Sequence, residues 1–397
     1  MPDLPLRICV RWREDGRREM SDWHVHVYTS TYTADVSGVC SAMYELGGMT
    51  VLHDPSGCNS TYTTHDEPRW YDSDSLMFVS GLDELTAVYG DDNVLVDNVT
   101  RTAKALNPRF ITLCGASIPH IIAFDFRGVA RLIEEKTGLP VLPVPTDGLR
   151  LYTSGVGLAQ RAFLRRFGVH SAEKRKGAVN LLGVTPIDFS RQEIVDAMKE
   201  ALTARGYTVN ACFSMGDSFE KLTKASEAEV NVVVSSAGFL PAKYLQAKYH
   251  MPYVVGTPIG KKMGDALSDA ISKAMGTGEN VSAVSPAEED SADLLIIGEE
   301  VLSKSLARAI ALETGERCRV LFPDPDEGID EDRLLSMIGK ARTVIADPLY
   351  RPAVETQGAT LIPLPHEGYS GRIYRALIPV FCGDGFDISA FLLGGCS

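Results

Sequence analysis

The sequence predicts an α/β protein with three domains, each built on a parallel, doubly wound sheet. Short, continuously apolar runs, typical of strands buried on both faces, alternate along the chain with longer segments of helical periodicity. This alternation indicates parallel sheets, because parallel strands are usually connected through a helix. Two polar stretches, residues 170–177 and 276–290, interrupt the pattern and divide it into three successive units.

The first unit, residues 36–170, follows an N-terminal arm over residues 1–35 that is rich in Arg, Trp, Tyr and Thr. The segments predicted as strands in this unit are Thr50–Leu52, Leu76–Ser80, Phe110–Leu113 and Val141–Val144. The segments predicted as helices are Asn93–Ala105, Gly128–Lys136 and Gly155–Phe167. Each of these strands is short and apolar, as expected for a sheet covered on both faces.

The second and third units, residues 178–275 and 291–397, repeat the scheme. The predicted strands are Ala178–Gly183, Thr208–Phe213, Glu229–Ser235, Tyr253–Val255, Asp293–Ile297, Arg319–Phe322, Thr343–Ile345 and Thr360–Leu364. The main predicted helices are Ser190–Arg205, Phe219–Ser226, Ala242–Tyr249, Leu302–Thr314 and Arg333–Ala341. A Gly-, Ser- and Pro-rich linker at residues 276–290 separates the two units.

The composition excludes several classes of function. The chain has 397 residues, is 45% hydrophobic and carries a net charge of −13, which argues against nucleic acid or an anionic membrane as a partner. No apolar run is long enough for a transmembrane helix, and the Arg-rich N-terminus has no apolar core of a secretory signal. We therefore expect a cytoplasmic protein whose eight cysteines are ligands or buried thiols rather than disulfides.

Three cysteines stand out, each in a loop-like context near the end of an apolar run. Cys40 lies among small residues, and Cys114 ends a predicted strand. Cys58 follows Pro55 and Gly57, which are residues that typically end a strand or helix. Ligand sites in open α/β sheets lie outside the carboxyl ends of strands, so these thiols could converge there. Soft thiolates suit an iron–sulfur cluster or zinc. Buried core cysteines are the alternative interpretation, because no CxxC pair marks a local chelate.

A family resemblance strengthens the ligand interpretation. His53-Asp-Pro-Ser-Gly-Cys58 is similar to the His-Gly-Pro-x-Gly-Cys motif of nitrogenase component 1 subunits and their relatives, which include light-independent protochlorophyllide reductase and nickel-sirohydrochlorin diamide cyclase. The segments Met77–Leu85, Asn107–Phe126 and Leu139–Gly148 resemble further family segments in the same order. The resemblance implies three Rossmann-like domains and covers most of residues 36–150.

Carried to this chain, the resemblance implies that Cys40, Cys58 and Cys114 bind an iron–sulfur cluster, [4Fe–4S] in type, at a subunit interface. It also implies electron delivery by a separate iron protein, which hydrolyses the ATP itself. A homodimer is expected, as in the homodimeric cyclase, with a heterodimer as the alternative. His53 is expected to tune the cluster through hydrogen bonds.

Other residues have weaker assignments. Three thiolates leave one iron without a ligand, and Asp35 or Asp54 could supply it, since a partner-subunit carboxylate does so in the protochlorophyllide reductases. Asp54 stands where the family usually has Gly, and Ile122-Ala-Phe124 replaces the Gly-Asp that precedes Asp125. His120 and Asp125 are candidate catalytic residues, and His120 could transfer protons.

The ligands of the large nitrogenase cofactor are missing. Ser235 stands where the resemblance places the cofactor cysteine, and His366 is out of register with the cofactor histidine, so dinitrogen reduction is not expected. The remaining cysteines, which match no family ligand, are Cys9, Cys212, Cys318, Cys382 and Cys396.

The sequence thus favours the catalytic component of a nitrogenase-like, ATP-dependent reductase. The resemblance favours a tetrapyrrole as its substrate, and a small sulfur or unsaturated compound stays open as the alternative. Two other functions stay open. The chain could be a scaffold or carrier on which a metallocofactor is assembled, or a binding protein of the same fold without a cluster.

Overall fold

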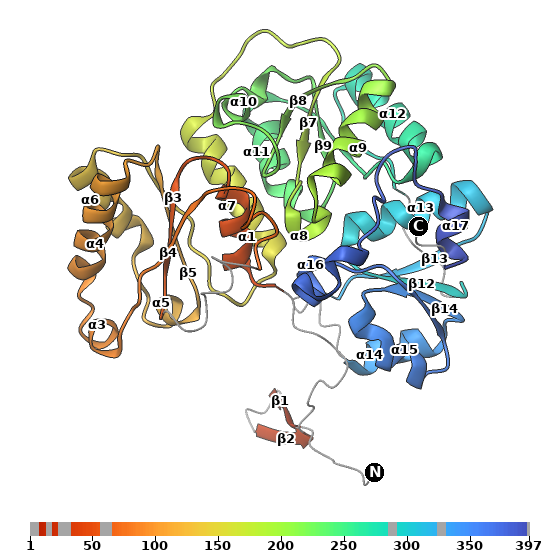
Figure 1. Cartoon of the computed structure of the whole chain (residues 1–397), viewed down its shortest axis with the longest axis horizontal. Coiled ribbons are helices and arrows are strands. Elements are labelled where there is room, and N and C mark those ends of the chain that lie inside the picture. The colour runs from red at the N-terminus through yellow and green to blue at the C-terminus, as the bar shows by residue number, and fades with distance from the viewer. Residues whose placement is uncertain are drawn as a thin grey trace.

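The structure is a computed structural model that describes residues 8–12, 18–22, 33–55, 66–284, 292–323 and 331–394. Figure 1 shows three lobes, each with its own sheet, arranged around a common centre. All strand pairs within these three sheets are parallel, and helices cover both faces. The predicted fold class is therefore confirmed, while the domain limits stay a prediction.

The first sheet has the strand order β4-β3-β5-β6. Its strands are β3 (Met49–His53), β4 (Leu76–Val79), β5 (Ile111–Gly115) and β6 (Val141–Pro143). Its helices are α1 (Asp35–Met43), α3 (Glu84–Tyr89), α4 (Asp92–Leu106), α5 (Ser117–Ile121), α6 (Phe126–Thr137) and α7 (Tyr152–Phe167). Residues that alternate along the strands pack on α4 and α6 on one face and on α1 and α7 on the other.

The second sheet has the order β11-β10-β9-β7-β8, and the third has the order β13-β12-β14-β15. The strands of the second are β7 (Ala178–Leu182), β8 (Thr208–Cys212), β9 (Val230–Val233), β10 (Tyr253–Val255) and β11 (Val281–Ser282). Those of the third are β12 (Leu294–Ile297), β13 (Cys318–Leu321), β14 (Thr343–Ala346) and β15 (Thr360–Pro363). β11 lies in the predicted linker 276–290, where Val281 pairs with Val254 at the sheet edge.

Helices connect the strands of these two sheets. They are α8 (Pro186–Phe189), α9 (Gln192–Ala204), α10 (Phe219–Thr223), α11 (Phe239–Tyr249), α12 (Gly260–Thr277), α13 (Glu300–Thr314), α14 (Glu331–Gly339), α15 (Arg351–Thr356), α16 (Glu367–Ser370) and α17 (Ile388–Leu392). Short 3₁₀ helices lie at Ala225–Glu227, Ser236–Gly238, Pro348–Tyr350 and Gly371–Leu377.

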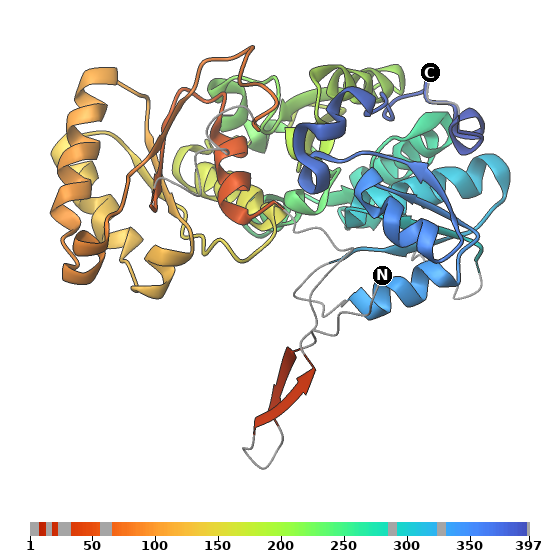
Figure 2. The same ribbon diagram turned by 60° about the horizontal axis from the view of Figure 1, so that its bottom comes forward.

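The N-terminal arm contains an antiparallel hairpin of β1 (Ile8–Trp12) and β2 (Arg18–Asp22). Figures 1 and 2 both place this hairpin outside the three lobes. The other residues before position 33 lie outside the described part of the chain.

Helix α1 corrects the prediction that Cys40 lies in a loop-like context, because Cys40 lies inside this helix. The surrounding small residues serve a close helix crossing instead. A Cβ atom on Gly38 would lie 2.1 Å from the carbonyl oxygen of Tyr152, and one on Gly155 would lie 1.8 Å from that of Asp35. α1 and α7 therefore pack backbone to backbone, and this tertiary contact outweighs the low helix propensity of glycine.

Candidate functional site

Cys40 and Cys114 meet at the carboxyl end of the first sheet. Both are buried, and the register of β3 and β5 places Leu52 beside Cys114. The Cys114 thiol lies 3.8 Å from the carbonyl oxygen of Val51, to which it donates a hydrogen bond. A hydrogen bond with Cys40, burial, and the negative charges of Cys40 and Asp35 raise the pKa of Cys114 well above its usual range. The predicted convergence of these two thiols is therefore present.

Asp35, the first residue of α1, holds the loop after β6 against this pair. Its carboxylate accepts hydrogen bonds from the backbone N–H groups of Asp147 (3.1 Å) and Gly148 (2.9 Å). Burial, and to a lesser degree the charge of Asp147, raise the pKa of Asp35 to about 6. The Thr146 hydroxyl donates to the carbonyl oxygen of Gly115 at 2.5 Å, which fixes the same loop beside Cys114.

His53 ends β3, Asp54 follows it, and both are buried. His53 Nδ1 lies 2.9 Å from the Ser80 hydroxyl oxygen, and the ring centroid lies 4.3 Å from that of Phe124. Burial lowers the pKa of His53 to about 4, so the imidazole is neutral at pH 7. Cys58, the third predicted ligand, lies in residues 56–65, outside the described residues.

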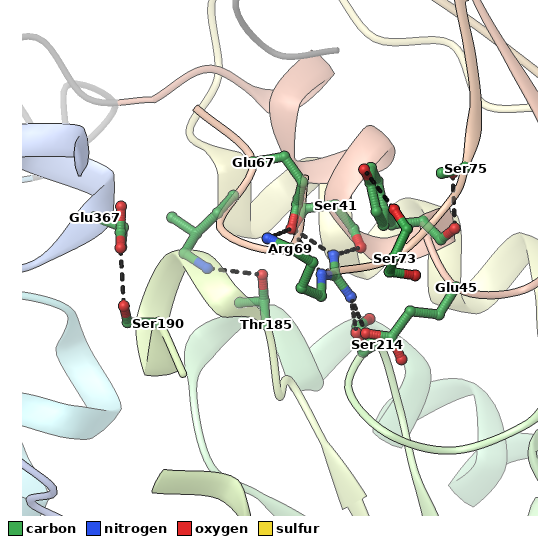
Figure 3. Close-up of polar contacts among 12 residues, drawn as sticks. Ser41, Glu45, Glu67, Arg69, Ser73, Ser75, Thr185, Ser190, Ser214 and Glu367 are labelled. Atoms are coloured by element: carbon green, nitrogen blue, oxygen red, sulfur yellow. Dashed lines mark hydrogen bonds and ion pairs between the residues drawn. The ribbon is translucent and has the colours of Figure 1, made fainter. Parts of the chain in front are cut away.

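The chain that follows this segment is anchored through Arg69 (Figure 3). Its guanidinium donates to Glu67 Oε1 at 2.6 Å and to Glu45 Oε1 at 2.7 Å. It also donates to the carbonyl oxygens of Ser41, beside Cys40, and of Ser214, in the second lobe. Arg69 thus ties the Cys58 segment to α1 and to the second lobe.

A second anchor reaches the third lobe. Arg375 donates to the backbone oxygen of Asp66 at 3.2 Å and forms an ion pair with Glu367. Glu367 also accepts a 2.8 Å hydrogen bond from Ser190 of the second lobe (Figure 3). The described residues Asp66 and Arg69 therefore lie where all three lobes meet.

A buried polar chain at this meeting point has no counterpart among the residues predicted from the sequence. The hydroxyl of Tyr152, from α7, donates to Asp188 Oδ1 at 2.5 Å. His366 Nδ1 accepts a hydrogen bond from the N–H of Gly368, so its Nε2 carries the proton shared with Asp188 Oδ1 at 3.2 Å. These residues lie far apart in the chain and form no local motif, so only the fold brings them together.

A second buried carboxyl group lies close to Asp188. Burial, and then the charge of Asp188, raise the pKa of Glu299 to about 7. Glu299 and His366 border a largely apolar cavity of about 40 Å³. This volume is far below the roughly 300 Å³ of a typical small-molecule pocket.

The residues at this place do not fit the large nitrogenase cofactor. Ser235 is buried, and its hydroxyl donates to the carbonyl oxygen of Gly183 at 2.7 Å. A Cβ atom on Gly183 would lie 2.9 Å from this hydroxyl, so the backbone already fills the space around Ser235. The Ser235 hydroxyl is therefore bonded within the protein, and the absence of the cofactor ligands stays a prediction from the sequence.

The two candidate catalytic residues lie on the surface. Asp125 is exposed and caps α6, accepting hydrogen bonds from the N–H groups of Arg127 and Gly128. His120 is exposed on α5 and lines a cavity of about 400 Å³ together with Asp147. Asp125 has a structural role in helix capping, whereas His120 faces open space.

The other described cysteines are separate buried thiols. Burial raises the pKa of Cys212 and of Cys318 to about 12 in each case, and it also raises that of Cys382 well above its usual range. The side chains of Cys9 and Cys396 lie outside the described residues. Within the described part of the chain, no three His, Cys, Asp or Glu side chains are grouped closely enough to hold a metal ion.

Comparison with known proteins decides the family. The model of the family described as nitrogenase component 1 type oxidoreductase matches residues 38–314, more than two thirds of the chain. The chain belongs to this family. Its members typically bind iron–sulfur clusters and work with partner proteins. None of the described helices is both long and apolar enough to cross a bilayer.

Two curated relatives illustrate the range of the nitrogenase component 1 family. The chain is 24% identical over 239 residues to the nitrogenase iron-molybdenum cofactor biosynthesis protein NifE of Clostridium pasteurianum, covering 56% of this chain and 51% of the relative. It is also 24% identical over 239 residues to one of the subunits of the light-independent protochlorophyllide reductase of Prosthecochloris aestuarii, covering 59% and 44%. The chain thus spans about half the length of these relatives.

The fold is similar to that of solved nitrogenase structures. Nitrogenase Cp1 at pH 5 superposes with a TM-score of 0.63 at 15% identity, covering 98% of this chain and 92% of that chain. The superposition extends the likeness beyond residue 314, so the third lobe also has the fold of this family.

Proposed function

We propose that this protein is the cluster-bearing catalytic component of a two-component, ATP-dependent reductase that acts in the cytoplasm. The observation that carries the proposal is the contact between Cys40 and Cys114. These thiols come from a helix and a strand 74 positions apart, yet both are buried in one cluster, where Cys40 and the nearby Asp35 raise the pKa of Cys114. The family assignment and the motif at residues 53–58 add Cys58 as the third thiol.

The donor set fits an iron–sulfur cluster. The neighbouring Cys40 and burial raise the pKa of the Cys114 thiol, and a cationic iron site would allow such a buried thiol to become a thiolate ligand. When bound, the cluster would accept electrons from a partner iron protein, which hydrolyses ATP, and pass them to substrate. His53 stays neutral and keeps its hydrogen bond to Ser80, so it contributes no positive charge near the ligand loop.

The carboxylate candidates for a fourth ligand differ in their surroundings. Both oxygens of Asp35 accept backbone hydrogen bonds, which favours a role for Asp35 in positioning the loop at residues 147 and 148. Asp54 is buried at the start of the segment that carries Cys58. We therefore prefer Asp54 as the ligand if this chain supplies it.

A homodimer is the proposed assembly. Apolar side chains lie exposed around the Cys114 end of the first sheet, namely Ile118, Ile121, Ile122 and Leu149. Ile121 and Leu149 are 73% and 71% exposed, which is typical of residues that a partner subunit covers. Such an interface would enclose a cluster site that opens toward it.

A tetrapyrrole is the proposed substrate class. One of the relatives belongs to a protochlorophyllide reductase, and Ser235, whose hydroxyl donates to the carbonyl oxygen of Gly183, is a poor ligand for the cofactor of dinitrogen reduction. Electrons would then pass from the cluster to the substrate without a second metal centre in this chain.

Replacement of the third thiol tests the ligand assignment. A Cys58→Ala variant purified without oxygen should lose its bound iron, and Cys114→Ala should do the same. Cys212→Ala is the matched control, because it removes a buried thiol from the second lobe. Full retention of iron in all three variants would refute the assignment.

A scaffold for metallocofactor assembly is the second candidate, and the similarity to NifE, a cofactor biosynthesis protein, favours it. Oxidation of the reduced cluster on addition of substrate would support the reductase. Transfer of an intact cluster to an acceptor protein, without substrate-dependent oxidation, would support the scaffold. A protein that stays free of iron after reconstitution would instead be a binding protein of the same fold.

A further inference from the structure

A groove of about 520 Å³ crosses the free edge of the first sheet. Strand β6 is the edge strand, and α6 and α7 lie on opposite faces of the sheet beside it (Figure 1). The charged residues that line the groove are Arg127, Arg131, Arg161, Arg165, Arg166 and Glu134. Five guanidinium groups against one carboxylate give this groove a strong positive charge in a chain whose net charge is −13.

Most of these arginines have no acidic partner. Arg166 forms an ion pair of 2.7 Å with Glu134, which joins α7 to α6 at one end of the groove. The other four arginines form no side-chain hydrogen bond or ion pair with any residue that the structure describes. They stand in two rows, each with two arginines one helical turn apart on the same helix. Like charges at this spacing destabilise a helix, so an anionic ligand is what would offset their repulsion.

The groove is closed to an added β-strand. The N–H of Val141, on the free side of β6, already donates to Glu134 Oε2 at 2.9 Å. Pro143 and Pro145, which follow it along the edge, have no N–H to offer. An extended acidic peptide therefore cannot pair with this edge, and recognition has to come from the side chains.

The floor of the groove is apolar. It is formed by side chains of β6 and by Leu158 and Ala162 of α7, between the two rows of arginines. A compact anion such as a triphosphate would engage one row and leave the apolar floor uncovered. A ligand with a flat apolar body and carboxylates on opposite edges would use both rows and the floor, because guanidinium forks pair with carboxylates in a bidentate geometry.

The groove borders the loop that contacts the cysteine site. Pro145 lines it and is followed by Thr146 and Asp147, which bond to Gly115 and to Asp35 beside Cys114. We propose that this groove binds a polycarboxylate with a flat apolar body, namely a carboxylated tetrapyrrole, close to the cluster site. The choice of a tetrapyrrole rests on the proposed function, whereas the polycarboxylate chemistry rests on the groove alone.

Uroporphyrin I, a tetrapyrrole with several carboxylates, is the probe, and its fluorescence reports binding to the purified full-length protein. The wild-type protein should bind it with an affinity that falls as salt is added. The double variant R131A/R165A should bind at least about tenfold more weakly, since each substitution removes a charge-assisted contact. The control R101A/R351A removes the same charge from exposed positions outside the groove and should bind like wild type.

Three further ligands separate the alternatives. ATP should not displace uroporphyrin at equal concentration, and a cationic tetra-N-methylpyridyl porphyrin should not bind. Mellitate, a benzene ring with carboxylates and no tetrapyrrole, should compete weakly. Strong competition by mellitate would support a groove that binds polycarboxylates, but it would contradict the assignment of a tetrapyrrole as the ligand.

Equal binding of uroporphyrin by wild type and R131A/R165A would overturn the proposal, as would displacement by ATP or equal binding of the cationic porphyrin. Weakened binding of an acidic partner protein by R131A/R165A, with unchanged uroporphyrin binding, would overturn it in favour of a protein interface. This titration needs neither iron nor an electron donor. A protein that binds uroporphyrin but lacks iron would therefore contradict the proposed reductase and leave the groove assignment standing.

Discussion

Burial separates the charged side chains that hold the site together from those that only cover the surface. Arg69 lies between Glu67 and Glu45 with 11% of its side chain exposed, and it makes backbone contacts to two lobes. Arg109 and Glu220 also form an ion pair, but their side chains are 53% and 62% exposed. The two arginines are therefore expected to differ strongly in their contribution to stability.

We expect Arg69→Met to lower the free energy of unfolding by about 3–5 kcal/mol, because it leaves two partly or fully buried carboxylates without their partner. Arg109→Met breaks an exposed pair and should cost at most about 1 kcal/mol. Urea unfolding followed by circular dichroism measures both. Similar losses in the two variants would show that the Arg69 network does not hold the lobes together.

The buried Glu299 makes stability depend on pH. Its folded pKa is about 7, against 4.5 for an ordinary glutamate, so the folded state retains this proton after the unfolded state has lost it. Between pH 4.5 and 7 the folded state therefore binds more protons, and stability falls as pH rises.

Wild-type protein should therefore lose up to about 3 kcal/mol of stability relative to Glu299→Gln as pH rises through this window. The measured quantity is the difference in unfolding free energy between the two proteins at each pH, which removes the contribution of all other groups. A difference that stays constant with pH, or one that changes in favour of the wild type, would contradict a raised pKa at Glu299.

Some residues of the site could be predicted from the sequence, and others could not. Cys114 could be predicted to lie at the site because it lies near the end of an apolar strand. Ligands of open α/β sheets bind outside the carboxyl ends of the strands. Asp188 and His366 could not, because Asp188 lies in a four-residue helix and meets His366 across 178 positions of the chain. Pairing of this kind depends on how the lobes pack, and no local pattern encodes it.

At the scale of elements, the crossing of α1 and α7 positions Cys40. Except for β11, which lies in the predicted linker, the strands of the three sheets were predictable because each is a short apolar run, and observed bounds agree to within a few residues. Helix α1 was not predicted, because Gly38 and the surrounding small residues have low helix propensity. The role of these small residues is to allow the close approach of α7, and this contact can be recognised only in the structure.

Gly155→Ala tests this crossing. The new methyl group would lie 1.8 Å from the carbonyl oxygen of Asp35, so α1 has to move away from α7 and carry Cys40 with it. We expect a loss of about 2 kcal/mol or more in stability, together with a lower iron content after anaerobic purification.

Gly276→Ala is the matched control, because this glycine is also helical, in α12, and a Cβ atom there meets nothing within 4 Å. It should leave iron content unchanged and stabilise the protein slightly, by up to about 1 kcal/mol. Unchanged iron in Gly155→Ala would mean that the α1 position does not govern the cysteine site.

At the scale of the whole molecule, the residues that follow the Cys58 segment contact all three lobes. The segment that carries Cys58 leaves the first sheet at β3, and its far end is held by Arg69 to the second lobe and by Arg375 to the third. The three lobes together therefore hold Asp66 and Arg69, although the sequence places every predicted ligand in the first unit.

Iron and acid-labile sulfide content, with an electron paramagnetic resonance spectrum of the reduced protein, tests the central claim most directly. Protein purified without oxygen should contain about four irons and four sulfides per cluster and give a signal on reduction. Protein that stays colourless and free of iron after anaerobic reconstitution would contradict the account, and Cys40 and Cys114 would then be core residues of an inherited fold.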